Sequence, residues 1–194
     1  MSEAARRGLY LFIAALAIIV GGVMYQHFWL GEDAAPAVGG PFALIDQDGA
    51  TRRDADFRGK IMLVYFGYTY CPDACPTTLQ AISSTLDLLG TDATKIEPVF
   101  ISVDPARDTP EQLKTYATNF HPDIVYLTGA QDALDKVERS YHVYVAKVKQ
   151  SGTDDYLIDH SSVIYVMGRD GRYLGQIPTG LPPKAMAASL KGYL

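Results

Sequence analysis

The clearest hydrophobic pattern lies at residues 61–89, where a predicted strand leads directly into a predicted helix. Residues 61–66 form a short apolar run, rich in β-branched and aromatic side chains, that ends at Gly67, and such a run is typical of a buried strand. Apolar residues then recur at intervals of three and four, which predicts one face of a helix over residues 76–89. These apolar positions are Leu79, Ile82, Leu86 and Leu89. The cysteines of the protein lie in the turn between the two elements.

The chain from residue 42 to residue 194 continues as an alternation of predicted strands and helices. Further strands are predicted at residues 42–46, 96–103, 124–127, 143–148, 162–167 and 173–177. Further helices are predicted at residues 110–120, 131–141 and 183–193. Residues 149–155 are polar with a Ser-Gly turn, which predicts a hairpin or a projecting loop. The alternation predicts an α/β domain with a central sheet flanked by helices, and a cysteine pair at the start of the helix after the first core strand predicts a thioredoxin-like arrangement.

An apolar segment without charged residues, residues 9–30, precedes this domain. A helix of 22 residues would be about 33 Å long, enough to cross a bilayer core of about 30 Å. Arg6 and Arg7 precede the segment and acidic residues follow it, so the positive-inside rule places residues 1–8 in the cytoplasm. The sequence therefore predicts a single-pass transmembrane anchor, with the remainder of the chain exported across the membrane.

A cleaved signal peptide is the alternative to an anchor, because residues 35–37 loosely resemble a small-residue cleavage site. The apolar segment is longer than the usual core of a signal peptide, which favours the anchor. Under either interpretation the rest of the chain is exported. Residues 31–40 are predicted to be a linker of small residues, which leaves residues 41–194 as the folded domain.

The charge and the cysteine count exclude some functions. Without Arg6, Arg7 and Glu3, the remaining 15 basic and 21 acidic residues give a net charge of −6, which argues against nucleic-acid binding. Two cysteines in an exported domain would by default form a structural disulfide. A bridge across so short a loop would restrict the unfolded chain little, so a structural role is the weaker interpretation.

Cys71 and Cys75 lie where the predicted strand turns into the predicted helix. The unpaired N–H groups and positive dipole of a helix N-terminus favour the thiolate, the form that attacks disulfides and binds metals. The spacing is Cys-x-x-x-Cys, and residues four apart on a helix have Cβ atoms about 5–6 Å apart. A disulfide prefers about 3.5–4.5 Å, whereas two sulfurs about 2.3 Å from one metal ion tolerate the wider separation. The spacing therefore permits both a redox pair and a metal clamp.

A third ligand would distinguish these alternatives, and His160 is the best candidate among the four histidines. It lies just before a predicted strand, at the mouth of a loop. His27 belongs to the apolar segment, His121 precedes a proline in a turn, and His142 follows a helix, where a histidine is commonplace. A plain surface histidine remains the alternative for His160 when position alone is considered.

Four segments in this order resemble the Sco/SenC family, and the resemblance covers about residues 38–194. The segments are residues 65–77 (YFGYTYCPDACPT), 101–110 (ISVDPARDTP), 159–162 (DHSS) and 168–171 (GRDG). The resemblance implies a thioredoxin-like protein tethered to the bacterial inner membrane with its domain in the periplasm, or to the mitochondrial inner membrane with its domain in the intermembrane space. It further implies that the protein binds one copper ion and helps to assemble the CuA centre of cytochrome c oxidase subunit II. Carried over by position, Cys71 and Cys75 match the thiolate ligands of the family and His160 matches its histidine ligand.

The donor set agrees with copper. Soft thiolates select Cu(I), and imidazole serves both copper states, whereas structural zinc would need a fourth protein ligand. A Cys₂His catalytic zinc site is the weaker alternative, since no general base is apparent. Further expected partners are another copper chaperone or a thioredoxin-like reductant.

Two functions therefore remain open at this point: a copper-binding assembly factor, and a thiol–disulfide oxidoreductase that reduces the cysteines of the partner. Four residues near the site have undecided roles. Asp73 could cap the helix or bias metal docking, and Asp159 could orient the imidazole or belong to a docking face. Tyr68 and Tyr70 could shield the site or serve as packing.

Overall fold

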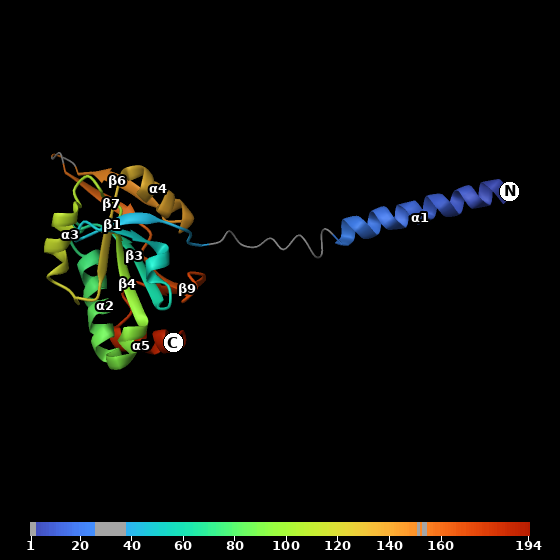
Figure 1. Cartoon of the computed structure of the whole chain (residues 1–194). Coiled ribbons are helices and arrows are strands. Elements are labelled where there is room, and N and C mark those ends of the chain that lie inside the picture. The colour runs from blue at the N-terminus through green and yellow to red at the C-terminus, as the bar shows by residue number, and fades with distance from the viewer. Residues whose placement is uncertain (1–2, 26–37, 151, 153–154) are drawn as a thin grey trace. The chain divides into compact units, whose positions relative to one another are not determined.

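The structure is a computed structural model that describes residues 3–25, 38–150, 152 and 155–194 (Figure 1). The α-helices are α1 (Glu3–Tyr25), α2 (Ala74–Leu89), α3 (Pro110–Ala117), α4 (Gln131–Ser140) and α5 (Pro183–Lys191). The strands are β1 (Ala43–Asp46), β2 (Thr51–Arg53), β3 (Ile61–Gly67), β4 (Ile96–Ser102), β5 (Val125–Thr128), β6 (Val145–Lys149), β7 (Tyr156–His160), β8 (Val163–Met167) and β9 (Tyr173–Pro178). Two short 3-10 helices are η2 (Asp54–Phe57) and η3 (Gly90–Lys95). The chain divides into two compact units, residues 1–36 and 37–194.

Helix α1 belongs to the first unit. The predicted anchor, residues 9–30, coincides with α1 as far as Tyr25, and residues 26–30 lie outside the described residues, as does most of the predicted linker. Within the described part of the chain, no helix combines the length and the apolar character that crossing a bilayer requires.

The second unit is built on a seven-stranded sheet in the order β2-β1-β5-β4-β3-β8-β9. Strand β3 pairs in parallel with β4 and antiparallel with β8, and every residue of β3 is buried. A strand covered on both faces needs apolar side chains at consecutive positions, which explains the unbroken hydrophobic run at residues 61–66. The predicted strand-to-helix unit is confirmed, and α2 begins at Ala74, two residues earlier than its apolar pattern indicates.

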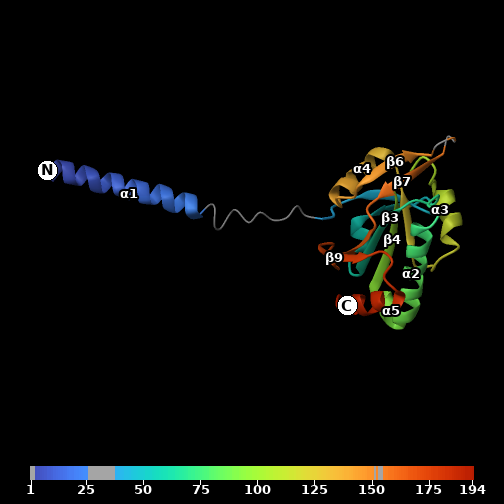
Figure 2. The same ribbon diagram turned by 180° about the vertical axis from the view of Figure 1, so that it is seen from behind.

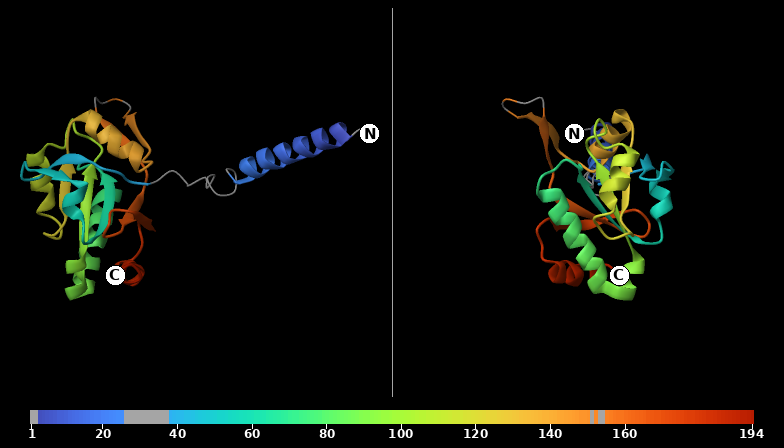
Figure 3. Two further views of the ribbon diagram at one scale, coloured as in Figure 1. Left: turned by 45° about the vertical axis from the view of Figure 1, so that its right-hand side comes forward. Right: turned by 90° about the vertical axis from the view of Figure 1, so that its left-hand side faces the viewer.

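Helices cover both faces of this sheet. On one face Tyr65 of β3 lies beside Phe100 of β4, and Phe100 contacts Tyr116 of α3. On the other face Phe66 packs edge-on against Tyr141, the residue after α4. Helix α5 packs on α2 (Figures 2 and 3). The predicted central sheet flanked by helices is confirmed.

Strands β6 and β7 form a separate two-stranded antiparallel sheet that shares no ladder with the main sheet among the described residues. The pairing of β6 with β7 confirms the hairpin alternative for the strands on either side of this segment, residues 149–155, and it corrects another expectation. The sequence suggests that His160 belongs to a loop, but residues 156–160 are strand β7 and His160 is its last residue. Strand β2 is a further element that the polar residues 51–53 did not reveal. Strands β2 and β7 are short and mostly exposed or half-buried, so they carry little of the hydrophobic pattern on which strand prediction relies.

Candidate metal centre

The two cysteines lie on the loop after β3 and on the first turn of α2. Cys75 is fully buried, Cys71 is half-buried, and both thiols are free. The backbone N–H of Cys75 donates a hydrogen bond to Sγ of Cys71 at 3.4 Å. Gly67, the last residue of β3, has no side chain between Phe100 and the Cys75 thiol, so the sulfur packs directly against the end of the strand.

The pKa values of the two thiols are shifted in opposite directions. The hydrogen bond from the Cys75 thiol lowers the pKa of Cys71 to about 5, with further help from the backbone N–H groups of Asp73 and Cys75, although burial acts against this shift. The pKa of Cys75 is raised, first because its proton is held in the bond to Cys71 and then because the thiol is buried. Cys71 is therefore the thiolate of the pair at neutral pH, as its place at a helix N-terminus predicts.

The His160 imidazole approaches the cysteines from the end of β7. Its Nε2 atom lies 3.7 Å from Sγ of Cys75, and its Nδ1 atom lies 3.1 Å from the carbonyl oxygen of Ser161. In the tautomer with a proton on Nδ1, that N–H donates to the Ser161 carbonyl and the lone pair of Nε2 faces the cysteines, as a metal ligand requires. The rings of Tyr65 and Tyr68 contact the imidazole edge-on and limit its rotation.

A hollow of about 290 Å³ opens beside these side chains. Its lining residues are Tyr68, Cys71, Pro72, Asp73, Ala74, Leu157, Ile158, Asp159, His160 and Ser162. Asp73 and Asp159 therefore border the same hollow as the two ligand candidates Cys71 and His160. The carboxylate of Asp73 accepts a hydrogen bond from Thr77 at 3.3 Å and makes no side-chain cap to α2.

The other histidines lie elsewhere. His121 precedes β5 and lies 3.8 Å from a carboxylate oxygen of Asp87 and 3.9 Å from one of Asp123. His142 occupies the turn after α4 with a positive φ of 55°. His27 lies outside the described residues. Of the described histidines, His160 is the one that contacts a cysteine.

Within the described residues, no three side chains of the His, Cys, Asp or Glu types are already arranged to hold a metal ion. Cys71 contacts Cys75 and Cys75 contacts His160, so the three are linked in a row. Their chemistry, two sulfurs and one imidazole nitrogen, nevertheless fits copper better than a hard cation.

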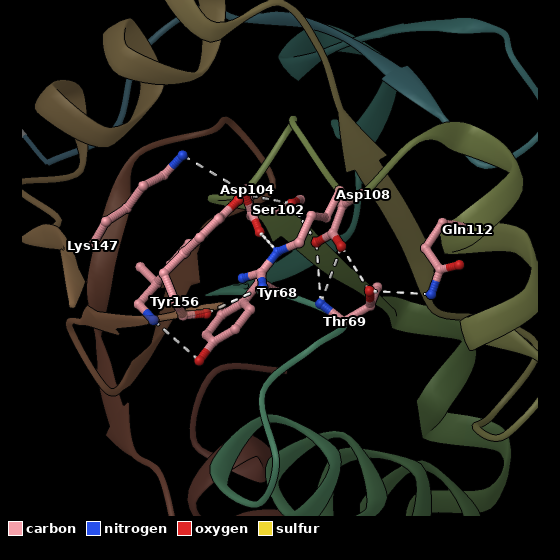
Figure 4. A network of polar contacts seen from close by, with 10 residues as sticks. Tyr68, Thr69, Ser102, Asp104, Asp108, Gln112, Lys147 and Tyr156 are labelled. Atoms are coloured by element: carbon pink, nitrogen blue, oxygen red, sulfur yellow. Dashed lines mark hydrogen bonds and ion pairs between the residues drawn. The ribbon is translucent and has the colours of Figure 1, made fainter. Parts of the chain in front are cut away.

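A buried carboxylate that the sequence suggested only as a possible cap of the helix at residue 110 holds the loop before Cys71, while Thr109 is the cap. Asp108 accepts hydrogen bonds from the backbone N–H of Thr69 at 3.1 Å, from the Thr69 hydroxyl at 2.6 Å and from the Ser102 hydroxyl at 2.6 Å (Figure 4). Burial raises the pKa of Asp108, and these donors oppose the shift. The segment 101–110 contributed to the resemblance, but its structural role becomes visible only where β4 and the cysteine loop meet.

Tyr68 has a structural role beyond shielding. Its hydroxyl oxygen accepts a hydrogen bond from the backbone N–H of Ile158 at 3.2 Å, which ties the cysteine loop to β7. Tyr70, by contrast, is 53% exposed. Only the first of the two tyrosines therefore lies in the packed interior of the site.

The fold and the site define a class of protein: an α/β domain with a reduced cysteine pair at a strand-to-helix turn and a histidine brought to it from a separate hairpin. The SCO1/SenC family profile matches residues 31–194. The chain belongs to the SCO1/SenC family.

Two relatives illustrate the likeness in sequence. The SCO2-like protein RP587 of Rickettsia prowazekii is 46% identical over 138 residues, which cover 71% of this chain and 67% of the relative. The mitochondrial SCO1 homolog of Homo sapiens is 36% identical over 161 residues, and these cover 82% of this chain and 54% of the human protein. This chain thus spans about half the length of the human protein.

Two solved structures extend the likeness to three dimensions. Bradyrhizobium japonicum ScoI with copper bound has a TM-score of 0.76 and 46% identity, covering 81% of this chain and 100% of that one. Yeast Sco1 with copper bound has a TM-score of 0.74 and 34% identity, covering 81% and 88%. The expected α/β thioredoxin-like fold is thereby confirmed, and structures of relatives with copper bound are among the close matches.

Proposed function

We propose that this protein is a copper-binding assembly factor that holds one copper ion through Cys71, Cys75 and His160. The observation that carries the proposal is the 3.7 Å contact between Nε2 of His160 and Sγ of Cys75, across 85 residues of sequence. The thiolate of Cys71, which lines a hollow together with His160, would add a second sulfur. The copper-bound structures of the two ScoI and Sco1 relatives support the same cargo.

Cys71, Cys75 and His160 each have a different role in the proposed metal binding. Cys71 supplies a ready thiolate, because its lowered pKa leaves it deprotonated at neutral pH. Cys75 loses its proton when the metal binds, since a thiol becomes a ligand only as the thiolate. The bond from Nδ1 of His160 to the Ser161 carbonyl fixes the imidazole in the form that presents Nε2.

The recipient of the copper is proposed to be the CuA site of cytochrome c oxidase subunit II, with a second copper chaperone as a source of the metal. The half-buried Cys71 borders the hollow, which leaves its sulfur open from that side. A membrane anchor at residues 9–30 would keep this domain near a membrane-bound oxidase. The support for the anchor is the uncharged sequence with two arginines before it.

A copper titration of the reduced full-length chain in detergent, combined with X-ray absorption, tests the proposal. The expected result is one copper per chain with two sulfur neighbours and nitrogen from one histidine. The variant His121→Ala serves as the matched control for His160→Ala, because His121 contacts aspartates and no cysteine. Copper without sulfur neighbours would refute the site. A loss of copper binding in His121→Ala as large as that in His160→Ala would also refute it.

The anchor has its own test. Full-length chain is expected to remain in the membrane pellet after carbonate extraction, whereas a chain lacking residues 9–30 is expected in the supernatant. Release of the full-length chain by carbonate would refute the anchor. Mass spectrometry of the exported chain separates the anchor from a signal peptide, since cleavage near residues 35–37 would shorten the chain.

A thiol–disulfide oxidoreductase is the second candidate, favoured by the contrast between the two thiols. The Cys71 thiolate would attack one sulfur of a partner disulfide and release the other sulfur as a thiolate. Cys75 would then attack the Cys71 sulfur, release the second partner thiol and leave a Cys71–Cys75 disulfide, so two electrons pass to the partner. A thioredoxin-like reductant would restore the thiols. Reduction of an oxidised CuA domain by one equivalent of the chain would support this candidate, and no reduction would exclude it.

A further inference from the structure

Strand β7 carries His160 but lies outside the main sheet, so contacts other than sheet pairing with that sheet must hold it against the domain. Tyr156, Ile158 and His160 alternate along the strand and therefore share one face. Ile158 is buried, which identifies this face as the one turned toward the domain. The ends of this face, Tyr156 and His160, are about 13 Å apart along the strand.

The Tyr156 end of this face is held by an arginine. The guanidinium carbon of Arg107 lies 3.7 Å from the centre of the Tyr156 ring, and its Nη1 donates a hydrogen bond to the Tyr156 carbonyl at 3.1 Å. The Tyr156 hydroxyl donates to Oδ1 of Asp104 at 2.7 Å. Nε of Arg107 donates to the other oxygen of the same carboxylate. Tyr156 is thus held by its ring, its hydroxyl and its backbone at once.

Asp104 is the buried carboxylate that accepts hydrogen bonds from both Arg107 and Tyr156. Its side chain is fully buried, and its backbone N–H donates to the Ser102 hydroxyl at 3.0 Å. Lys147 of β6 adds a second cation, with Nζ 3.8 Å from Asp104 and 4.7 Å from the centre of the Tyr156 ring (Figure 4). Both strands of the hairpin therefore converge on one carboxylate in the loop after β4.

The same guanidinium also reaches the cysteine loop. Its carbon lies 4.8 Å from the ring of Tyr70 and 5.7 Å from that of Tyr68. Tyr70 immediately precedes Cys71. Arg107 therefore contacts both segments that supply the candidate ligands, the strand that carries His160 and the loop that carries Cys71.

We propose that Arg107 and Tyr156 are positioning residues, whose stacked contact sets where β7 holds the His160 imidazole relative to the cysteine pair. The effect that this inference predicts on copper binding rests on the proposed function. The contact of Arg107 with Tyr156, called the clamp below, exists in the metal-free chain and can be tested without copper. Stacking and a charge-assisted hydrogen bond together hold the strand. A planar guanidinium can stack on the ring while its nitrogens donate to Asp104 and to the Tyr156 carbonyl, which a lysine ammonium cannot do at once.

The first measurement is amide hydrogen exchange of the metal-free, full-length chain in detergent. Tyr156→Leu and Arg107→Lys are each expected to accelerate exchange in β6 and β7 about tenfold, while exchange in β3 stays at the wild-type rate. Tyr156→Phe keeps the ring beneath Arg107 and is expected to change exchange less than Tyr156→Leu. Arg52→Lys is the matched control, because Arg52 stacks on Phe57 at 5.0 Å outside the hairpin.

The second measurement uses Cu(II) alone as the probe, with electron paramagnetic resonance to detect the histidine nitrogen and competition with a chelator to measure affinity. Tyr156→Leu and Arg107→Lys are expected to broaden the nitrogen signal and to weaken Cu(II) binding about tenfold, and Arg52→Lys to change neither.

The two proposals fail in different ways. Wild-type exchange rates in Tyr156→Leu and Arg107→Lys would overturn the clamp and leave the proposed function standing. A wild-type chain that binds Cu(II) without a nitrogen signal would overturn the histidine ligand, and accelerated exchange would still support the clamp. Acceleration in β3 as well as in the hairpin would show a general loss of stability and overturn a positioning role.

Discussion

His160 Nε2 lies 3.7 Å from Cys75 Sγ, although 85 residues separate the two in the sequence. The contact exists because β8, which follows His160, pairs antiparallel with β3, which precedes the cysteines. The end of β3 and the start of β8 therefore meet at one edge of the sheet. This pairing brings the imidazole to the thiols.

Replacing His160 by alanine is expected to weaken Cu(II) binding by at least about tenfold, because a nitrogen ligand is lost. Reaction of Cys71 with a disulfide reagent should slow far less, since the main cause of its lowered pKa is the bond from Cys75. Chelator competition and stopped-flow thiol exchange measure the two effects. Unchanged Cu(II) affinity would remove His160 from the site.

The alkylation rate of Cys71 by iodoacetamide is expected to change little between pH 6 and pH 8, because a thiol with a pKa of about 5 is already ionised across this range. In Cys75→Ala the hydrogen bond is lost, the pKa of Cys71 rises, and alkylation at pH 6 should slow. A wild-type rate that climbs tenfold per pH unit from 6 to 8 would contradict the assignment.

Gly67→Ala is expected to lower the free energy of unfolding, because the added methyl group would collide with core atoms beside the cysteine site. An added Cβ would lie 2.7 Å from Cε2 of Phe100 and 2.9 Å from Sγ of Cys75, both in the core. Overpacking of this kind costs about 1–3 kcal/mol of unfolding free energy. Urea denaturation measures the loss. Gly129→Ala is the control, because its added Cβ would meet the Leu44 side chain at 3.1 Å, and a larger loss there than at Gly67 would contradict the prediction.

Glu138→Gln is expected to stabilise the protein at pH 8 and to have no effect at pH 4. Burial, followed by the nearby Asp135 carboxylate, raises the pKa of Glu138 to about 7, and its Oε1 has no hydrogen-bond partner within the described residues. Because the folded-state pKa is above the unfolded value, the folded state retains the proton more strongly, and the free energy of unfolding falls as the pH rises from about 4.5 to about 7.

Because Glu138 is only half-buried, the gain from the glutamine at pH 8 should be about 1 kcal/mol. Urea denaturation of both proteins at pH 4 and pH 8 measures it. Equal stability of variant and wild type at pH 8, or destabilisation by the glutamine, would contradict the raised pKa.

The strand, the helix and the cysteine pair at the centre of this domain could be predicted from local sequence. They depend on patterns within a few residues: the apolar run at residues 61–66, the helical spacing after it, and the two cysteines between these segments. The family resemblance singled out His160. What local patterns do not encode is the order of strands in a sheet and the register between them.

Tertiary structure decided the rest. The separate hairpin that carries His160, the buried carboxylate of Asp108 beneath the cysteine loop and the stacking of Arg107 on Tyr156 all join segments that are distant in sequence. Judged by their sequence neighbours alone, Arg107, Asp108 and Tyr156 look like ordinary polar surface residues. A buried charge becomes stable only when several chain segments supply its partners together, and that condition exists only in the folded state.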